Sequence, residues 1–178
     1  MFDREQFIAD CRAALDGSHS ARNMREVVAR AVSEPADVLH SLGEPKHGGL
    51  DVLLRSPELT ILNVQWPAKF VVMPHDHEMW AVIGIYTGRE DNILWRRLPE
   101  GADVQIEAAG AKSLCERDTL ALGADVIHSV VNPIPRMSGA IHVYGGDFFA
   151  VQRSEWDPES LREQPYDMQK VLRMLAEG

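Results

Sequence analysis

Long apolar runs are missing from this sequence. Its 178 residues contain no uninterrupted apolar stretch of about 18 residues, the length that a transmembrane helix requires. The chain opens with Met1-Phe2-Asp3-Arg4-Glu5, without the basic and then apolar order of a secretory signal. We therefore expect a cytoplasmic protein.

Cysteine is also scarce. Cys11 and Cys115 are the only two, and they do not form a C-x-x-C pair. Two isolated thiols favour neither a zinc knuckle nor a disulfide framework. We expect both to be buried, reduced and structural.

Basic residues are fewer than acidic ones. The chain has 27 acidic and 18 basic residues and a formal net charge of −9, which repels phosphate backbones and anionic lipid surfaces. Arg96 and Arg97 are the only adjacent basic pair, and we assign them to a solvated strand end. Neither a nucleic acid nor a membrane is expected as a partner.

The composition is that of an ordinary globular protein, with 45% hydrophobic and 25% charged residues. The length is typical of one domain, and no internal repeat is visible, so residues 1–178 are expected to share one core. Within this domain we distinguish a helical N-terminal segment (1–45), a β-barrel (48–150) and a C-terminal tail with a helix (151–178).

Helical patterns occupy both ends of the chain. Apolar residues recur at three and four between residues 3 and 15, where Asp3 and Gln6 are spaced as in a capping box. A second helix is predicted from Ser20, and a third from Pro35 to Gly43. The same spacing predicts a helix over residues 166–176.

The middle of the chain is typical of β-strands. After Gly48-Gly49, short runs rich in Val, Ile, Leu and Trp are separated by turn residues at intervals of about ten. The expected strands are 50–55, 59–66, 70–73, 79–86, 93–98, 103–108, 119–122, 129–132 and 139–145. A jelly-roll barrel closes such a set of strands with few exposed edges.

Two histidines lie close together at the end of a predicted strand. In Pro74-His75-Asp76-His77 the histidines are two apart, so strand alternation turns both to one side. Both imidazoles can then reach one metal ion inside a barrel. Asp76 and Glu78 are expected to point away, either into solvent or into a contact that fixes the strand entrance.

A third histidine completes the pattern. His128 begins a later strand, and Asn132 follows it as His-x-x-x-Asn. Together with the histidine pair and Gly88, this sequence resembles the two motifs of the cupin superfamily. The resemblance implies a mainly β fold, a double-stranded β-helix or jelly-roll barrel, with His75, His77 and His128 as ligands of one divalent metal ion.

The carboxylate ligand of many cupins is missing at its usual place, where this chain has Ala81 and Val82. Three neutral ligands leave the metal with its full positive charge, which favours an anionic substrate. The ligand set resembles that of the cysteine dioxygenase family, which oxygenates thiols. The resemblance implies Fe²⁺, with zinc or nickel as the alternative metal.

The likeness to thiol dioxygenases extends to a second sphere. His142 and Tyr144 share a strand face in Ala140-Ile141-His142-Val143-Tyr144, similar to the family's Ser-x-His-x-Tyr. By resemblance, His142 orients the Tyr144 hydroxyl toward dioxygen or substrate. Arg55 resembles the family's substrate arginine and could clamp a carboxylate, although a surface ion pair is the alternative.

Three departures from that family bear on the substrate. Val82 stands where some cysteine dioxygenases have the cysteine that cross-links to tyrosine, Ala140 replaces a serine, and Gly145-Gly146 replaces Ser-Pro. No Cys–Tyr cross-link can form here. The glycines also change the backbone freedom of the pocket wall.

Two classes of function follow from this pattern. The first is a dioxygenase that converts the sulfur of a small thiol carboxylate to a sulfinate with O₂. The alternatives are a non-redox cupin that binds a small anion as sensor or carrier, and a three-histidine oxygenase acting on a non-thiol substrate. A monomer or a homodimer is expected.

Overall fold

The computed structural model describes residues 1–15, 20–99 and 104–178. Its helices are α1 (Arg4–Leu15), α2 (Ser20–Val32), α3 (Pro35–Leu42) and α4 (Met168–Glu177). Its strands are β1 (Gly49–Arg55), β2 (Thr60–Trp66), β3 (Val71–His75), β4 (Ala81–Thr87), β5 (Arg89–Arg97), β6 (Ile106–Cys115), β7 (Thr119–Leu122), β8 (Ile127–Val131), β9 (Ser138–Tyr144), β10 (Ser154–Trp156) and β11 (Glu163–Pro165).

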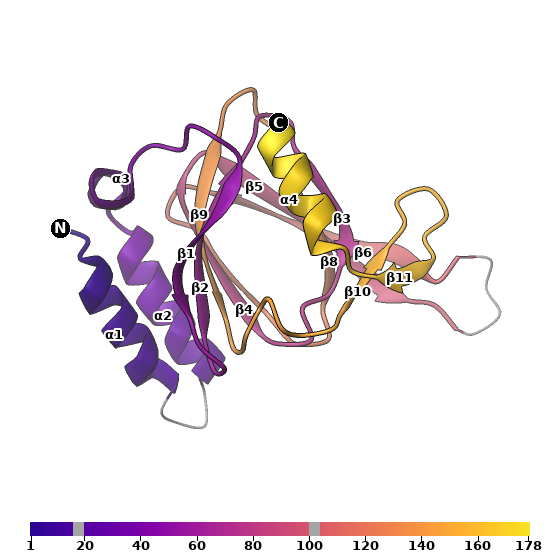
Figure 1. Ribbon diagram of the computed structural model, residues 1–178, viewed down its shortest axis with the longest axis horizontal. Coiled ribbons are helices and arrows are strands. Elements are labelled where there is room, and N and C mark those ends of the chain that lie inside the picture. Colours follow the sequence, from indigo (N-terminus) through magenta and orange to yellow (C-terminus); the bar gives the residue numbers. More distant parts are fainter. Residues whose placement is uncertain (16–19, 100–103) are drawn as a thin grey trace.

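Two antiparallel sheets face each other across the interior (Figure 1). One has the strand order β1-β2-β9-β4-β7, the other β11-β10-β3-β8-β5-β6. From β2 to β10 the chain passes from one sheet to the other at every connection except the β5–β6 hairpin. This alternation is that of a double-stranded β-helix, so the predicted jelly-roll barrel with helical ends is confirmed.

The N-terminal helices cover the outer face of the first sheet (Figure 1). Successive residues of β4 therefore meet different neighbours: Ala81 and Ile83 belong to the barrel interior, whereas Val82 and Tyr86 pack beneath the helices. Burial on both faces explains why these strands are apolar almost throughout. The same alternation turns every second side chain of β9 into the barrel.

The C-terminal helix α4 lies against the barrel beside β1 (Figure 1). Asp167 caps it by accepting the amide hydrogen of Lys170 at 3.0 Å. Val171 and Leu175, on one stripe of the helix, are buried in the interior core. The tail thus closes part of the barrel and contributes to its core.

Some details differ from the prediction. β6 runs on to Cys115, well beyond the predicted 103–108, of which position 103 lies outside the described residues, and the short strands β10 and β11 were not predicted. Cys11 is buried, and its burial raises the pKa of the thiol to about 12. The predicted burial of Cys115 is wrong, because this residue ends an edge strand and is exposed.

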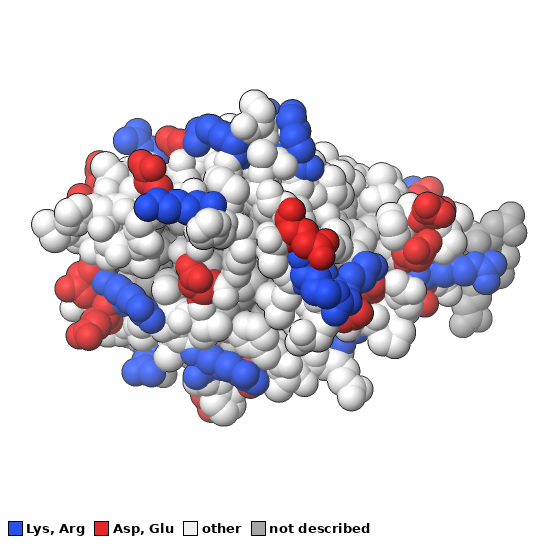
Figure 2. Space-filling model, turned by 45° about the horizontal axis from the view of Figure 1, so that its top comes forward, with Lys and Arg blue, Asp and Glu red and all other residues white. Residues whose placement is uncertain are grey.

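Basic and acidic side chains are interspersed over the face shown in Figure 2. Within the described ranges 1–15, 20–99 and 104–178, no helix has the length and apolar character needed to cross a lipid bilayer.

Candidate metal centre

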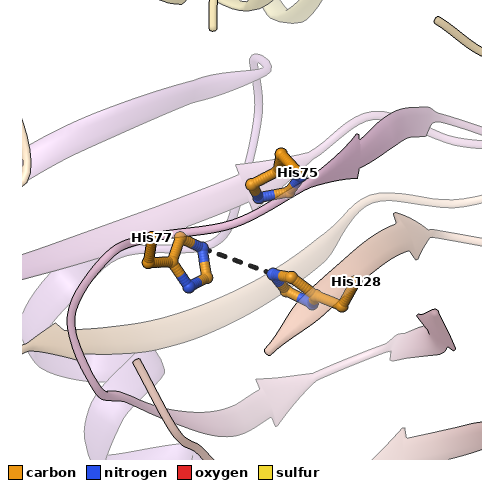
Figure 3. A group of neighbouring side chains, drawn as sticks. All are labelled: His75, His77 and His128. Atoms are coloured by element: carbon orange, nitrogen blue, oxygen red, sulfur yellow. Dashed lines mark hydrogen bonds between the residues drawn. The ribbon is translucent and has the colours of Figure 1, made fainter. Parts of the chain in front are cut away.

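Three histidines meet inside the barrel. His75 ends β3 and lies directly opposite His128 of β8 in the antiparallel register, while His77 lies in the loop that follows β3 (Figure 3). Their ligand nitrogens all lie within 4.8 Å of one another, and Nε2 of His77 is 3.3 Å from Nε2 of His128. All three side chains are buried. The group could therefore hold one metal ion.

The convergence has a different cause from the predicted one. Strand alternation predicts that His75 and His77 share a face, but β3 ends at His75. The chain then turns, and Glu78 adopts a left-handed conformation with φ of 54°. Asp76 is buried, not solvated, and accepts the amide hydrogen of Ser154 at 2.9 Å. Asp76 thereby fixes the histidine loop to β10.

Hydrogen bonds set the proton positions of two of the three rings. Nδ1 of His75 is 2.9 Å from the carbonyl oxygen of Met73, and Nδ1 of His128 is 2.7 Å from Oδ1 of Asn92. These oxygens only accept, so each Nδ1 carries the hydrogen and each Nε2 keeps its lone pair. His77 Nδ1 is buried without a hydrogen-bond partner among the described residues. The donor set fits a divalent metal ion that prefers imidazole nitrogen.

Burial also keeps the rings neutral. It lowers the pKa of His75 from 6.5 to about 4, the backbone hydrogen bond to Met73 opposing the shift only in part. Burial and the neighbouring His128 and His75 rings lower the pKa of His77 well below its ordinary value, and burial does the same for His128. At neutral pH, protons therefore do not compete with a metal for these nitrogens.

The metal-free protein is expected to lose stability as the pH falls from 6.5 toward 4. In this window the unfolded chain binds a proton at His75 and the folded chain does not, so the free energy of unfolding rises with pH. Each such histidine contributes a slope of up to about 1.4 kcal/mol per pH unit. Urea unfolding of chelator-treated protein at several pH values measures the slope. Equal stability at neutral pH and at the acid end of this window would contradict the expected burial of neutral rings.

The predicted second-sphere residues line the same cavity as the three histidines. His142 and Tyr144 both point inward from β9, and Nδ1 of His142 is 3.0 Å from the Tyr144 hydroxyl oxygen. The Tyr144 ring centroid is 5.1 Å from that of His77. Burial raises the pKa of Tyr144 above its ordinary value, so the phenol keeps its proton at neutral pH.

A carboxylate that sequence analysis missed lies near this pair. Glu90 is fully buried, and its Oε2 is 3.1 Å from Nε2 of His142. Burial alone would raise the pKa of Glu90, but the His142 ring and hydrogen bonds from Asn92 and Trp66 hold that pKa below its ordinary value. The barrel therefore contains a carboxylate, although not among the three candidate ligands.

Arg55 is held at the surface by an ion pair. Its Nε and Nη2 atoms donate to the two carboxylate oxygens of Asp147 at 2.9 and 3.0 Å, and its guanidinium lies over the Phe149 ring. The side chain is half-exposed and does not line the cavity of the three histidines. Of the two roles considered from sequence, the structure shows the ion pair.

Arg153, which sequence analysis missed, is the buried cation near the histidines. Its guanidinium lies between the rings of Phe148 and Tyr166, 4.1 and 4.2 Å from their centroids, and Nη1 donates to the Phe148 carbonyl oxygen. Nε and Nη2 are buried and have no hydrogen-bond partner among the described residues. Its charge lowers the pKa of His75 and His77, after the larger effect of burial. A single arginine in the connection between β9 and β10 carries no pattern that sequence analysis could detect.

Two cavities share the two aromatic rings that flank this arginine. The inner one, lined by the three histidines, His142 and Tyr144, has a volume of about 30 Å³, room for about one or two water molecules. The outer one is about 500 Å³ and is lined by residues of the β9–β10 connection, by Arg153 and by Met168. Phe148 and Tyr166 line both cavities. A small ligand in the outer pocket would therefore have to pass these two rings to reach the histidines.

The other motif residues hold the backbone in place. Asn132 is buried and donates to the carbonyl oxygens of Pro67 and Arg136 at 2.7 and 2.9 Å. Gly88 has a φ of 82°, and a Cβ there would lie 2.3 Å from the Ser138 hydroxyl oxygen. Both positions stabilise turns near the site and do not reach its cavity.

No known protein-family model matches the chain. Among solved structures, the DMSP lyase DddQ from Ruegeria pomeroyi is similar at 18% identity and a TM-score of 0.48, over 64% of this chain and 53% of that protein. A cupin superfamily protein from Desulfitobacterium hafniense is 15% identical with a TM-score of 0.47, over 61% of this chain and 88% of that protein. A cupin family protein with a double-stranded β-helix fold from Methanocaldococcus jannaschii is 11% identical with a TM-score of 0.45. The similarity covers 60% of this chain and 85% of that protein.

Proposed function

We propose that this chain is a non-heme iron dioxygenase that oxidises the sulfur of a small thiol carboxylate to a sulfinate. The observation that carries the proposal is the position of Arg153: a buried guanidinium with a vacant edge, close to three neutral histidines that could hold one metal ion. In the reaction R–SH + O₂ → R–SO₂⁻ + H⁺, the sulfur loses four electrons, dioxygen gains four, and both oxygen atoms end on sulfur. Bound iron would supply the electron transfer between thiol and dioxygen.

Arg153 would bind the carboxylate of the substrate. The vacant Nε and Nη2 atoms form the same edge of the guanidinium that Arg55 uses to hold Asp147 in two parallel hydrogen bonds. This edge matches the two oxygens of a carboxylate. A buried cation without a partner is unfavourable, so an anion that pairs with it gains binding energy.

The three histidines and Tyr144 would act on the other end of the substrate. The histidines are neutral donors, so they leave the charge of a divalent ion uncompensated and favour a thiolate as a further ligand. The Tyr144 hydroxyl, oriented by His142 at 3.0 Å, holds a proton beside the histidine cavity. The hydroxyl would turn this single hydrogen from His142 toward an oxygen atom that is transferred to sulfur, exchanging one hydrogen bond for the other.

Iron-loaded protein is expected to consume O₂ only when a thiol carboxylate is added. The thiol should be added without oxygen first, and uptake and sulfinate formation measured after oxygen is admitted. A thiol of equal length with an amide in place of the carboxylate is the matched control, and its uptake is expected to be at least about 10-fold slower, because it lacks a charge-assisted pair with Arg153.

The alternatives predict other results in the same experiment. No uptake with any thiol, although iron is fully bound, would contradict the dioxygenase proposal. A redox-inert metal retained at full occupancy would then support the anion-binding sensor or carrier. Uptake with a non-thiol substrate would support a different three-histidine oxygenase.

A further inference from the structure

Glu90 is the centre of a buried hydrogen-bond network that connects a candidate metal ligand with the second sphere. Its Oε2 accepts from Nε1 of Trp66 at 2.7 Å and lies 3.1 Å from Nε2 of His142. Its Oε1 accepts from Nδ2 of Asn92 at 2.9 Å. Glu90 and Asn92 are both fully buried. Three donors thus converge on one carboxylate that water does not reach.

We propose that Glu90 is a positioning residue that determines which nitrogen carries the hydrogen in both His128 and His142. The inference rests on the proposed role of the three histidines as metal ligands, but it concerns a residue outside that set. Glu90 touches neither a metal ligand nor the substrate pocket in the described structure. It would act through the directions of the hydrogen bonds alone.

One branch of the network passes through Asn92 to His128. A carboxylate can only accept hydrogen bonds, so Glu90 compels Asn92 to turn its NH₂ group toward Oε1. Oδ1 of Asn92 must then face Nδ1 of His128, at 2.7 Å, and it too can only accept. The hydrogen of His128 is therefore held on Nδ1, and Nε2, the nitrogen that faces His77, keeps its lone pair for a metal.

The other branch passes through His142 to Tyr144. Because Oε2 of Glu90 accepts, Nε2 of His142 carries a hydrogen. When Nδ1 of this ring carries no hydrogen, it accepts from the Tyr144 hydroxyl at 3.0 Å. One carboxylate thus fixes the orientation of the amide, the imidazole and the phenol around the histidine cavity.

The substitution Glu90→Gln is expected to shift the hydrogen of His128. A glutamine offers one acceptor and one NH₂ group where the carboxylate offered two acceptors. The indole of Trp66 can only donate, so the new amide oxygen must take the place of Oε2 and the new NH₂ must face Asn92. Asn92 then turns over and presents its own NH₂ to Nδ1 of His128. The His128 hydrogen moves to Nε2, the nitrogen that a metal needs.

Nitrogen-15 NMR of histidine-labelled, metal-free protein at neutral pH shows directly which ring nitrogen of His128 carries the hydrogen. We expect His128 to carry its hydrogen on Nδ1 in the wild type and on Nε2 in Glu90→Gln. The affinity for Zn²⁺ in the same variant is expected to fall by about 10–100-fold, the usual effect of losing an outer-shell partner. The matched control is Glu155→Gln, since Glu155 is also buried but holds Gln164 and Lys170 of the tail, and it should leave His128 unchanged.

The double substitution Glu90→Gln with Asn92→Asp is the decisive variant. It exchanges the amide and the carboxylate, so that the new carboxylate at position 92 accepts from both the new NH₂ at position 90 and Nδ1 of His128. The hydrogen should return to Nδ1, and the affinity for Zn²⁺ should recover. A purely structural role for Glu90 predicts no such recovery.

Two results would overturn the proposal. One is a wild-type spectrum with the His128 hydrogen on Nε2, which needs no variant at all and remains available if Glu90→Gln fails to fold. The other is a Glu90→Gln protein that keeps the hydrogen on Nδ1. Neither depends on thiol oxidation, so a failure here is distinguishable from a failure of the proposed reaction.

Discussion

The substitution His128→Ala is expected to abolish metal binding and, with it, any oxygen consumption. His128 provides one of three candidate nitrogens within 4.8 Å, and its Nε2 lies 3.3 Å from that of His77. Losing a ligand should reduce the affinity for Fe²⁺ or Zn²⁺ by more than the roughly 10–100-fold that follows loss of an outer-shell partner. Titration calorimetry with Zn²⁺, and oxygen uptake after iron loading, measure the two effects.

The control for this variant is His47→Ala, because His47 is exposed and lies outside the barrel. It should bind metal and consume oxygen as the wild type does. Retention of wild-type zinc affinity in His128→Ala would exclude the three-histidine site. Thermal unfolding of both variants separates loss of the ligand from loss of the fold.

Much of the fold was predictable because its elements have strong periodic patterns. The helix starts depend on local chemistry: Asp3 accepts the amide hydrogen of Gln6 at 2.9 Å, and Pro35 occupies the first turn of α3. The apolar strands depend on burial of both sheet faces. By contrast, β10 and β11 have three residues each and no visible period. Contacts with the rest of the barrel determine such short strands, and these are not local in sequence.

The three histidines could be predicted, whereas the residues that tune them could not. The segment Arg89-Glu90-Asp91-Asn92 has the polar composition of a turn, but it begins β5, and its alternate members Glu90 and Asn92 point inward. The alternation shows which residues share a face; it does not show that the polar face is the buried one. Only the partners, Trp66, His142 and His128, make that burial favourable, and they come from three other strands.

The substitution Arg153→Gln is expected to reduce kcat/KM for a thiol carboxylate by at least about 100-fold. The change removes two charge-assisted hydrogen bonds to the carboxylate, and bonds to charged groups contribute about 1.5–3 kcal/mol each. A thiol with an amide in place of the carboxylate should react at the same slow rate in the variant and the wild type. Steady-state oxygen uptake with both substrates measures the difference.

Arg55→Gln is the matched control. In both arginines the edge formed by Nε and Nη2 is suited to a carboxylate, but only in Arg55 does a carboxylate already occupy it. In Arg55 that edge is filled by Asp147, at a half-exposed position where an ion pair contributes little, so kcat/KM should change less than about 2-fold. In Arg153 the edge is vacant and buried. The variant Arg153→Lys keeps the positive charge but cannot form the bidentate hydrogen bonds, so its kcat/KM should lie between those of Arg153→Gln and the wild type. If Arg55→Gln impaired the reaction and Arg153→Gln did not, the carboxylate would bind at the surface, and the buried guanidinium would serve only to stack between Phe148 and Tyr166.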